Sequence, residues 1–235
     1  MPRGDDRPRD RTRGGEARVS TAVTSVSPDG LRVVSPRRPS RAGVVLHGYG
    51  GDGSEVTALA AALAERLNAR VFVPDLPGHG SASTTRLSLA AVRAAVAAVA
   101  AKAGTSLDFA VGHSMGARLA LDLDAAAFVL LAMPGEPVFG ASTRELVRTL
   151  RPQCVNESEP LAGLMEVLSA PLAVPERPTL LLTPADEIPS GVALAEEWAA
   201  RGVESRRVEN TTHRDIVASP EAIDAAVRWL EARPV

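Results

Sequence analysis

A serine between two glycines is the residue of this sequence best suited to covalent chemistry. Residues 112–116 read Gly-His-Ser-Met-Gly, which fits the pattern Gly-x-Ser-x-Gly. In that pattern the serine occupies a strained turn from a strand into a helix, where any side chain in place of the glycines would collide with neighbouring backbone. Backbone N–H groups at the start of the helix can then stabilise an oxyanion. We therefore predict that Ser114 is the nucleophile of an acyl-transfer reaction.

A serine hydroxyl needs a neighbouring base before it becomes nucleophilic. The sequence contains four histidines. His113 adjoins the serine on a tight turn, where neighbouring side chains diverge, while His47 and His79 lie in early glycine-rich loops. His213 follows the last expected strand and precedes the last expected helix, at the sheet edge where the sites of open α/β proteins gather. His213 is therefore the predicted base.

The carboxylate that orients the base is expected after a strand, between the serine and the histidine in chain order. Asp186 follows a strand expected over residues 178–183 and leaves room for one helix and one strand before His213. Glu187 is its neighbour and could take the same role. We favour Asp186 as the orienting acid.

These residues require an alternation of strands and helices to bring them together. Short apolar runs of the kind found in strands covered on both faces occupy residues 43–46, 107–111 and 127–132. Further strands are expected over residues 19–26, 31–34, 70–73, 178–183 and 203–208, the first two as a hairpin. Helices are expected over residues 55–67, 89–101, 115–123, 192–200 and 220–232. The alternation predicts an α/β protein with a mostly parallel sheet and helices on both faces.

Two segments stand outside this alternation. Residues 136–174 contain two helical candidates, 143–150 and 160–168, and no strand, so we interpret the segment as an insertion. Residues 1–18 mix Arg, Asp and Gly and are expected to be a disordered leader. The rest, residues 19–235, is expected to be one domain.

Composition limits the function further. Apolar residues make up 45% of the chain and the net charge is −2, so a sizeable core is expected and no basic stripe for nucleic acid is present. The single cysteine, Cys154, excludes an intramolecular disulfide and a Cys-x-x-Cys zinc site. No apolar run is long enough for a membrane span. We expect a cytoplasmic enzyme without a cofactor, and the Arg- and Ala-rich composition suggests a bacterial source.

Three glycine motifs together resemble those of the α/β-hydrolase superfamily. A strand is followed by His47-Gly48-Tyr49-Gly50, residues 75–80 read Asp-Leu-Pro-Gly-His-Gly, and residues 112–116 follow in the same order. The resemblance extends from about Val19 to the C-terminus. It implies the α/β-hydrolase fold, with residues 136–174 as a small helical cap over the substrate pocket.

The resemblance also implies roles for individual residues. Ser114, Asp186 and His213 would be nucleophile, acid and base, and the backbone N–H groups of Tyr49 and Met115 would form the oxyanion hole. The acid loop is about one residue shorter before its proline than the commonest family pattern, which leaves Asp186 against Glu187 open. Thr212 stands before the base, where the family frequently has Gly. A serine at the turn argues against the epoxide-hydrolase and haloalkane-dehalogenase branches, which carry Asp there.

The first functional hypothesis is an esterase or thioesterase that acts on a small or medium acyl substrate. A lyase or cyclase that uses the same triad is the second hypothesis, and a catalytically silent binding or interaction protein is the third. Arg144, Arg148 and Arg151 could share one helical face within the insertion. We interpret that face as solvated rather than as an anion clamp or a carrier-protein docking site.

Overall fold

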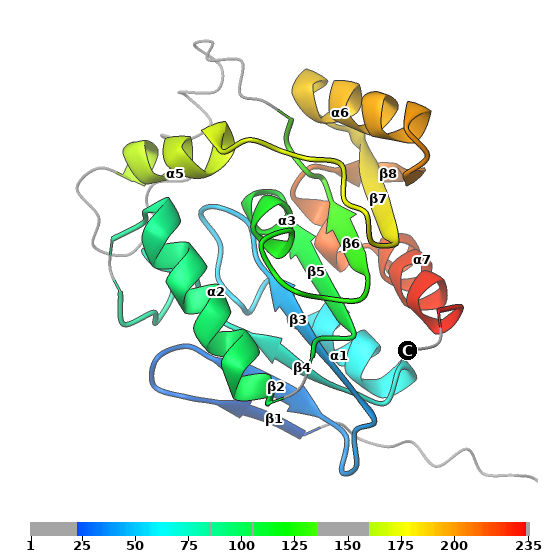
Figure 1. The fold of residues 1–235 in the computed structure, drawn as a ribbon. Helices are drawn as coiled ribbons and strands as arrows, with labels where there is room; N and C mark the ends of the chain where they lie inside the picture. Colours follow the sequence, from blue (N-terminus) through cyan, green and yellow to red (C-terminus); the bar gives the residue numbers. More distant parts are fainter. Residues whose placement is uncertain (1–22, 85, 105, 136–159, 234–235) are drawn as a thin grey trace, which may run out of the picture.

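One mixed sheet organises the part of the chain that the structure describes. The computed structural model describes residues 23–84, 86–104, 106–135 and 160–233. Within them an eight-stranded sheet has the order β1-β2-β4-β3-β5-β6-β7-β8 (Figure 1). The strands are β1 Val23–Val26, β2 Arg32–Ser35, β3 Arg41–Leu46, β4 Ala69–Val73, β5 Phe109–His113, β6 Phe128–Leu131, β7 Thr179–Asp186 and β8 Glu204–Thr212.

The sheet is mostly parallel, as the alternation of elements predicts. Strand β1 pairs with β2, and β2 with β4, in antiparallel fashion. All the other neighbours pair in parallel. Parallel pairing brings the carboxyl ends of β3, β5, β7 and β8 to one edge of the sheet, and the chain leaves these strands there through the motifs singled out above.

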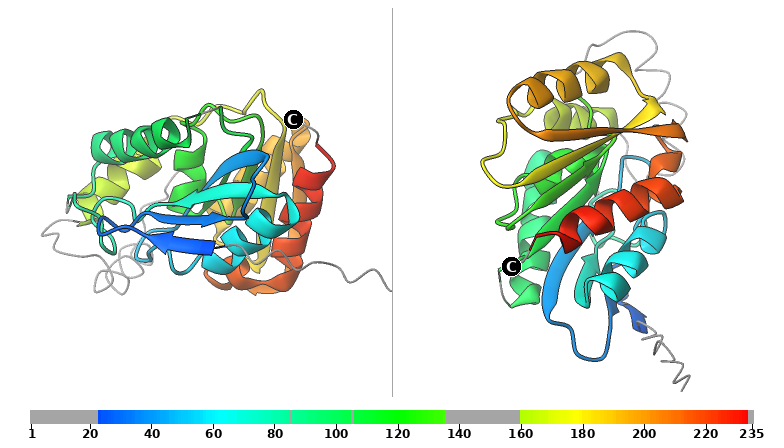
Figure 2. Two further views of the ribbon diagram at one scale, coloured as in Figure 1. Left: turned by 90° about the horizontal axis from the view of Figure 1, so that it is seen from below. Right: turned by 90° about the vertical axis from the view of Figure 1, so that its right-hand side faces the viewer.

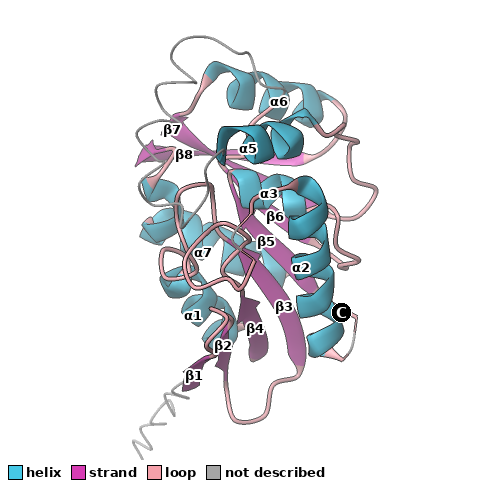
Figure 3. Ribbon diagram, turned by 90° about the vertical axis from the view of Figure 1, so that its left-hand side faces the viewer, coloured by secondary structure: helices cyan, strands magenta, loops and turns pink. Residues whose placement is uncertain are grey.

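Helices cover both faces of the sheet. Helices α1 (Thr57–Arg66) and α7 (Pro220–Glu231) pack on one face. Helices α2 (Leu89–Ala103), α3 (Met115–Ala120), α5 (Pro160–Ser169) and α6 (Pro189–Ala200) lie on the other, as Figures 2 and 3 show. A short 3-10 helix, η2 (Asp215–Ala218), leads into α7. None of the helices described in these residues is long and apolar enough to cross a membrane.

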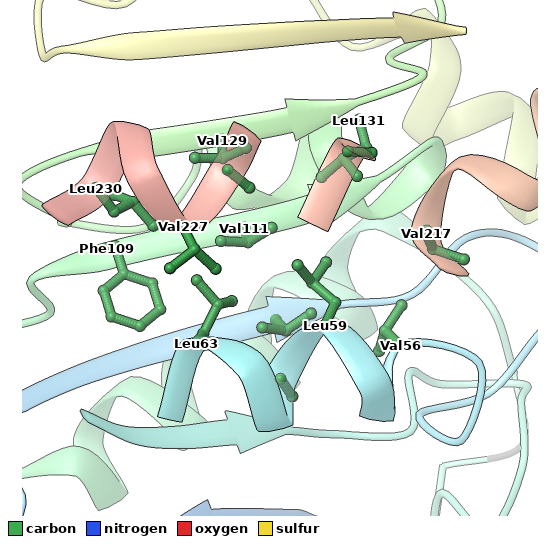
Figure 4. Packing of buried hydrophobic residues seen from close by; sticks show 14 of the residues in the cluster. Val56, Leu59, Leu63, Phe109, Val111, Val129, Leu131, Val217, Val227 and Leu230 are labelled. Atoms are coloured by element: carbon green, nitrogen blue, oxygen red, sulfur yellow. The ribbon is translucent and has the colours of Figure 1, made fainter. Parts of the chain in front are cut away.

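Alternate residues of the central strands fill two separate cores. Phe109 and Val111 of β5 pack under α1 and α7 (Figure 4), whereas Ala110 belongs to the core on the opposite face. Successive side chains of a strand point to opposite faces, so a strand covered on both sides must be apolar throughout. Burying one large aliphatic or aromatic side chain contributes about 1.5–3 kcal/mol. The unbroken apolar runs in the central strands therefore indicate that helices cover both faces of the sheet.

Part of the expected insertion is described. Helix α5 confirms the helix expected over residues 160–168. The helix expected over residues 143–150 and the expected leader, residues 1–18, lie outside the described residues.

Arg118 of α3 joins the segment after β6 to the end of α5. Its side chain is buried, and its guanidinium donates to the carbonyl oxygens of Pro134 (3.1 Å) and Gly135 (3.3 Å), just after β6. It also donates to the carbonyl oxygens of Val167 (3.3 Å), in the last turn of α5, and of Ala170. One side chain therefore holds the chain on both sides of residues 136–159.

Two buried histidines join the glycine loops that follow β3 and β4. Nε2 of His47 accepts a hydrogen bond from the backbone N–H of Leu76 (2.9 Å), and its Nδ1 donates to the carbonyl oxygen of Gly48 (2.8 Å). Nε2 of His79 accepts from the backbone N–H of Gly50 (3.1 Å), and its Nδ1 donates to the carbonyl oxygen of Pro77. An imidazole that both donates and accepts must be neutral.

Asp75 forms a second connection between the same loops. Its carboxylate is buried and accepts from the backbone N–H groups of Gly53 and Ser81, each at 2.8 Å. Arg32 of β2 donates to the same carboxylate at 2.5 Å. The loops between β3 and α1 and after β4 are thereby fixed at the carboxyl edge of the sheet.

The neutral buried histidines predict a loss of stability in mild acid. Burial, with a smaller contribution from His79, lowers the pKa of His47 from 6.5 to about 4. Burial, with the nearby His213, lowers that of His113 to about 3. Below pH 6.5 these histidines bind protons in the unfolded chain but stay neutral in the folded chain. The free energy of unfolding therefore falls as the pH falls toward 4. It should fall by about 1.4 kcal/mol per pH unit for each histidine.

Urea unfolding curves between about pH 7 and pH 5 measure this slope. His47→Gln should remove one histidine's share of it, on average about 1 kcal/mol per pH unit over this range, because a free histidine is only partly protonated near pH 7. An equal slope in wild type and variant would contradict the assignment.

Arg118→Met should destabilise the protein by roughly 2–4 kcal/mol, because four carbonyl groups lose a charged donor in a buried setting. Arg93→Met is the matched control, since Arg93 pairs with Asp122 at the surface and such pairs are worth less than about 1 kcal/mol. Equal shifts of the urea midpoint in the two variants would show that Arg118 is not an anchor.

Candidate active site

Ser114 stands on a strained turn between β5 and α3. Its φ is +52°, a backbone conformation that residues other than glycine rarely adopt. Its backbone N–H donates to the carbonyl oxygen of Leu131 at 2.9 Å, which ties the turn to β6. Strain of this kind costs of order 1–3 kcal/mol and clusters at functional sites.

The two flanking glycines are required by close packing of backbone, as the motif predicts. A Cβ added to Gly112 would lie 2.2 Å from the carbonyl oxygen of Gly116. A Cβ on Gly116 would lie 2.5 Å from the carbonyl oxygens of Leu46 and His47. Strand β5, helix α3 and the end of β3 therefore approach one another more closely than any side chain would allow.

His213 reaches the serine from the loop after β8. Its Nε2 lies 2.9 Å from Oγ of Ser114. The side chain is 29% exposed, which leaves room for a substrate beside it. The hydroxyl and the imidazole are thus within the distance at which a base can take a proton.

Glu187 holds the other nitrogen of this imidazole. Its Oε1 lies 2.7 Å from Nδ1 of His213 and also accepts from the backbone N–H of Ile188 at 2.7 Å. The Glu187 side chain is 1% exposed. A carboxylate only accepts, so the proton is on Nδ1, and the free pair on Nε2 faces the serine. Gly191 of α6 permits this burial, because a Cβ there would lie 2.9 Å from Cγ of Glu187.

The prediction that Asp186 orients the base is therefore wrong. The structure brings its neighbour, Glu187, to His213. Strand β7 runs on through Asp186, which pairs with Thr212 and is exposed, whereas the sequence pattern ends the strand at residue 183. Successive residues of an extended chain face opposite sides. The extra strand length thus turns Asp186 away from the base and leaves Glu187 facing it.

One feature of the sequence relates to the choice between Asp186 and Glu187: the loop before the proline is about one residue shorter than in the commonest family pattern. The register between β7 and β8 shifts just before the loop: Pro184 pairs with Val208, but Asp186 pairs with Thr212. Asn210, with φ of +54°, lies within the irregularity. Such a shift depends on pairing between two strands and cannot be seen in either strand alone.

Of the two expected oxyanion residues, Met115 adjoins the serine in the chain, and Tyr49 follows Gly48, which approaches the serine from the end of β3. Met115 is the first residue of α3 and follows Ser114 directly. Tyr49 lies in the loop after β3, next to Gly48, and a Cβ on Gly48 would lie 3.3 Å from Cβ of Ser114. His47 and His79 hold the Gly48 carbonyl and the Gly50 N–H on either side of Tyr49.

His113, which the sequence pattern set aside as a base, contacts the backbone of His213. Its buried ring donates through Nε2 to the carbonyl oxygen of His213 at 2.7 Å.

Among the described residues no group of three or more His, Cys, Asp or Glu could hold a metal ion. A hollow of about 410 Å³ lies between α2, α3 and the segment before β7, and none of Ser114, Glu187 and His213 lines it.

Comparison with known proteins identifies the family. The model of the alpha/beta hydrolase family matches residues 44–208. No curated protein matches the sequence.

Solved structures share the fold at low sequence identity. A thermophilic esterase from Thermogutta terrifontis is 18% identical, with a TM-score of 0.64 over 90% of this chain and 98% of its own. MenH from S. aureus is 16% identical, with a TM-score of 0.64 over 86% of this chain and 97% of its own. An epoxide hydrolase from hot-environment metagenomes is 15% identical, with a TM-score of 0.62 over 91% of this chain and 99% of its own. With the family model covering most of the sheet and its connecting loops, the chain belongs to the alpha/beta hydrolase family.

Proposed function

We propose that the protein is a serine hydrolase that cleaves a carboxylic ester or thioester of a small to medium acyl substrate through an acyl-enzyme. The observation that carries the proposal is the chain of contacts from Ser114 through His213 to Glu187, at 2.9 Å and 2.7 Å. Nucleophile, base and orienting acid are arranged in the order that activates a hydroxyl.

In the first half of the reaction, Nε2 of His213 takes the hydroxyl proton while Oγ of Ser114 attacks the carbonyl carbon. The negative charge that develops on the carbonyl oxygen is stabilised by the backbone N–H groups of Met115 and Tyr49. The imidazolium then gives its proton to the departing alcohol or thiol as the bond to the acyl carbon breaks. Glu187 keeps the imidazole in the required tautomer and stabilises its positive charge.

In the second half, water replaces the leaving group. His213 takes a proton from the water molecule while the water oxygen attacks the acyl carbon. His213 then gives that proton to Ser114 Oγ when the acid is released. The connection between the loops through His47 and His79 supports this step as well, because it fixes the peptide groups on both sides of Tyr49. Loss of one oxyanion donor costs roughly 3–4 kcal/mol in barrier height.

A fluorophosphonate probe should label the wild-type protein, and Ser114→Ala should abolish both labelling and hydrolysis of a p-nitrophenyl ester series. The expected loss in kcat is at least about 10³-fold. Ser88→Ala is the control, because Ser88 caps α2 and its loss affects stability by only about 1 kcal/mol.

Absence of both labelling and ester turnover in the wild type would contradict the proposal and favour a silent binding protein. Labelling without turnover of any ester or thioester would favour a lyase or cyclase that uses the same triad.

The acid is tested by two variants that change one atom each. Glu187→Gln should lower kcat by roughly 10³–10⁴-fold, because an amide cannot hold the Nδ1 proton in the same way. Asp186→Asn should leave kcat within about 3-fold of wild type, since exposed substitutions away from a site change little. The opposite order of effects would return the role to Asp186.

A further inference from the structure

The ring of His113 lies between the nucleophile and the loop that carries the base. His113 ends β5, directly before Ser114, and its side chain is buried. Nε2 lies 2.7 Å from the backbone carbonyl oxygen of His213, and the two rings are 5.5 Å apart at their centroids. This hydrogen bond thus joins residues that stand 100 positions apart in the chain.

The partner of this ring fixes its protonation. A carbonyl oxygen only accepts, so Nε2 carries a proton. Burial lowers the pKa of the ring to about 3, so the ring is neutral and Nδ1 carries none. Nδ1 is buried and has no hydrogen-bond partner among the described residues. Gly48 closes that side, because a Cβ on it would lie 2.8 Å from Nδ1. Within the described part of the chain, the His113 side chain therefore makes one hydrogen bond, to the His213 carbonyl.

Apart from the contact between His213 and Glu187, two side-chain contacts beside the base lie nearer to solvent. Oγ1 of Thr212 donates to Asp215 at 2.7 Å, and Arg214 pairs with Glu55 at 3.1 Å. Thr212, Arg214 and Asp215 are all exposed. Exposed pairs contribute little to rigidity, whereas a hydrogen bond from a buried ring competes less with water and holds its geometry better.

We propose that His113 is a positioning residue of the reaction: its ring tethers the backbone of His213 to the end of β5 and thereby sets the distance between Nε2 of His213 and Oγ of Ser114. The inference rests on the proposed function for its catalytic consequence. Because His113 and Ser114 are consecutive, the base loop is held from the same turn that carries the nucleophile. A displacement of about 1 Å at such a contact can cost about 10²-fold in rate.

The test compares His113→Leu with His113→Gln. Leucine fills the space without a donor, and it should lower kcat and the rate of fluorophosphonate labelling by roughly 10- to 100-fold while KM stays within about 3-fold. The carboxamide of glutamine can donate to the same carbonyl, so His113→Gln should recover most of the rate. Thermal unfolding of both variants shows whether they are folded.

Thr179→Val is the matched control. Thr179 is also buried, and its hydroxyl donates to a backbone carbonyl, that of Arg177, at 2.9 Å. This variant should lose stability and keep its labelling rate. A wild-type rate in His113→Leu, or an equal loss of rate in His113→Leu and His113→Gln when both are folded, would overturn the proposal.

A double-mutant cycle separates tethering from damage to the serine turn. If His113 acts through the His213 side chain, His113→Leu should not slow the residual labelling of His213→Ala any further. A further slowing of the same size would show that His113 supports Ser114 itself and would overturn the proposal.

A measurement that does not depend on catalysis distinguishes this inference from the proposed function. Nitrogen-15 spectra of the histidine rings should show the same Nε2 signal of His213 in the wild type and in His113→Gln, and a shifted signal in His113→Leu, because a displaced base loop alters the hydrogen bond between Nε2 and Ser114 Oγ. If the wild type is never labelled by the probe, the proposed function fails, and the spectra alone decide whether the tether exists. Identical His213 spectra in wild type and His113→Leu would overturn it.

Discussion

The close approach of three backbone segments at the Ser114 turn is the constraint on which the site depends. Gly112 and Gly116 allow β5, α3 and the end of β3 to touch without intervening side chains. The same contact brings the Gly48–Gly50 loop beside the serine. The two apolar cores hold this junction from opposite faces of the sheet, so the strained φ of Ser114 is maintained by packing rather than by the local sequence.

Hydrogen bonds from histidine rings to backbone recur around this junction. His47, His79 and His113 all contact peptide groups, and all three have lowered pKa values because burial disfavours the imidazolium. Histidine suits this use because a neutral ring offers one donor and one acceptor on opposite sides, at a size that spans two loops. The remaining histidine, His213, is the one that is partly exposed.

The parts of the site that depend on short-range patterns can be predicted from the sequence. Ser114 and His213 follow from a turn motif and from chain order, and the strands that precede them are apolar enough to recognise. The acid was assigned to the wrong neighbour, because its side is decided by how far β7 pairs with β8. The hydrogen bond of His113 cannot be predicted from the sequence either, because its partner is a carbonyl group 100 residues away and no side-chain pattern records it.

Arg118 has a consequence for how this fold can diversify. Because one guanidinium holds the carbonyl groups of both Gly135 and Val167, the segment after β6 and the end of α5 meet at one point. The entropy of closing a loop whose ends are already fixed grows slowly, by about 0.6 kcal/mol for each doubling of its length. Insertions or deletions between these two anchors should therefore cost little stability, so this stretch of chain can change in length while the sheet and the Ser114 turn stay as they are.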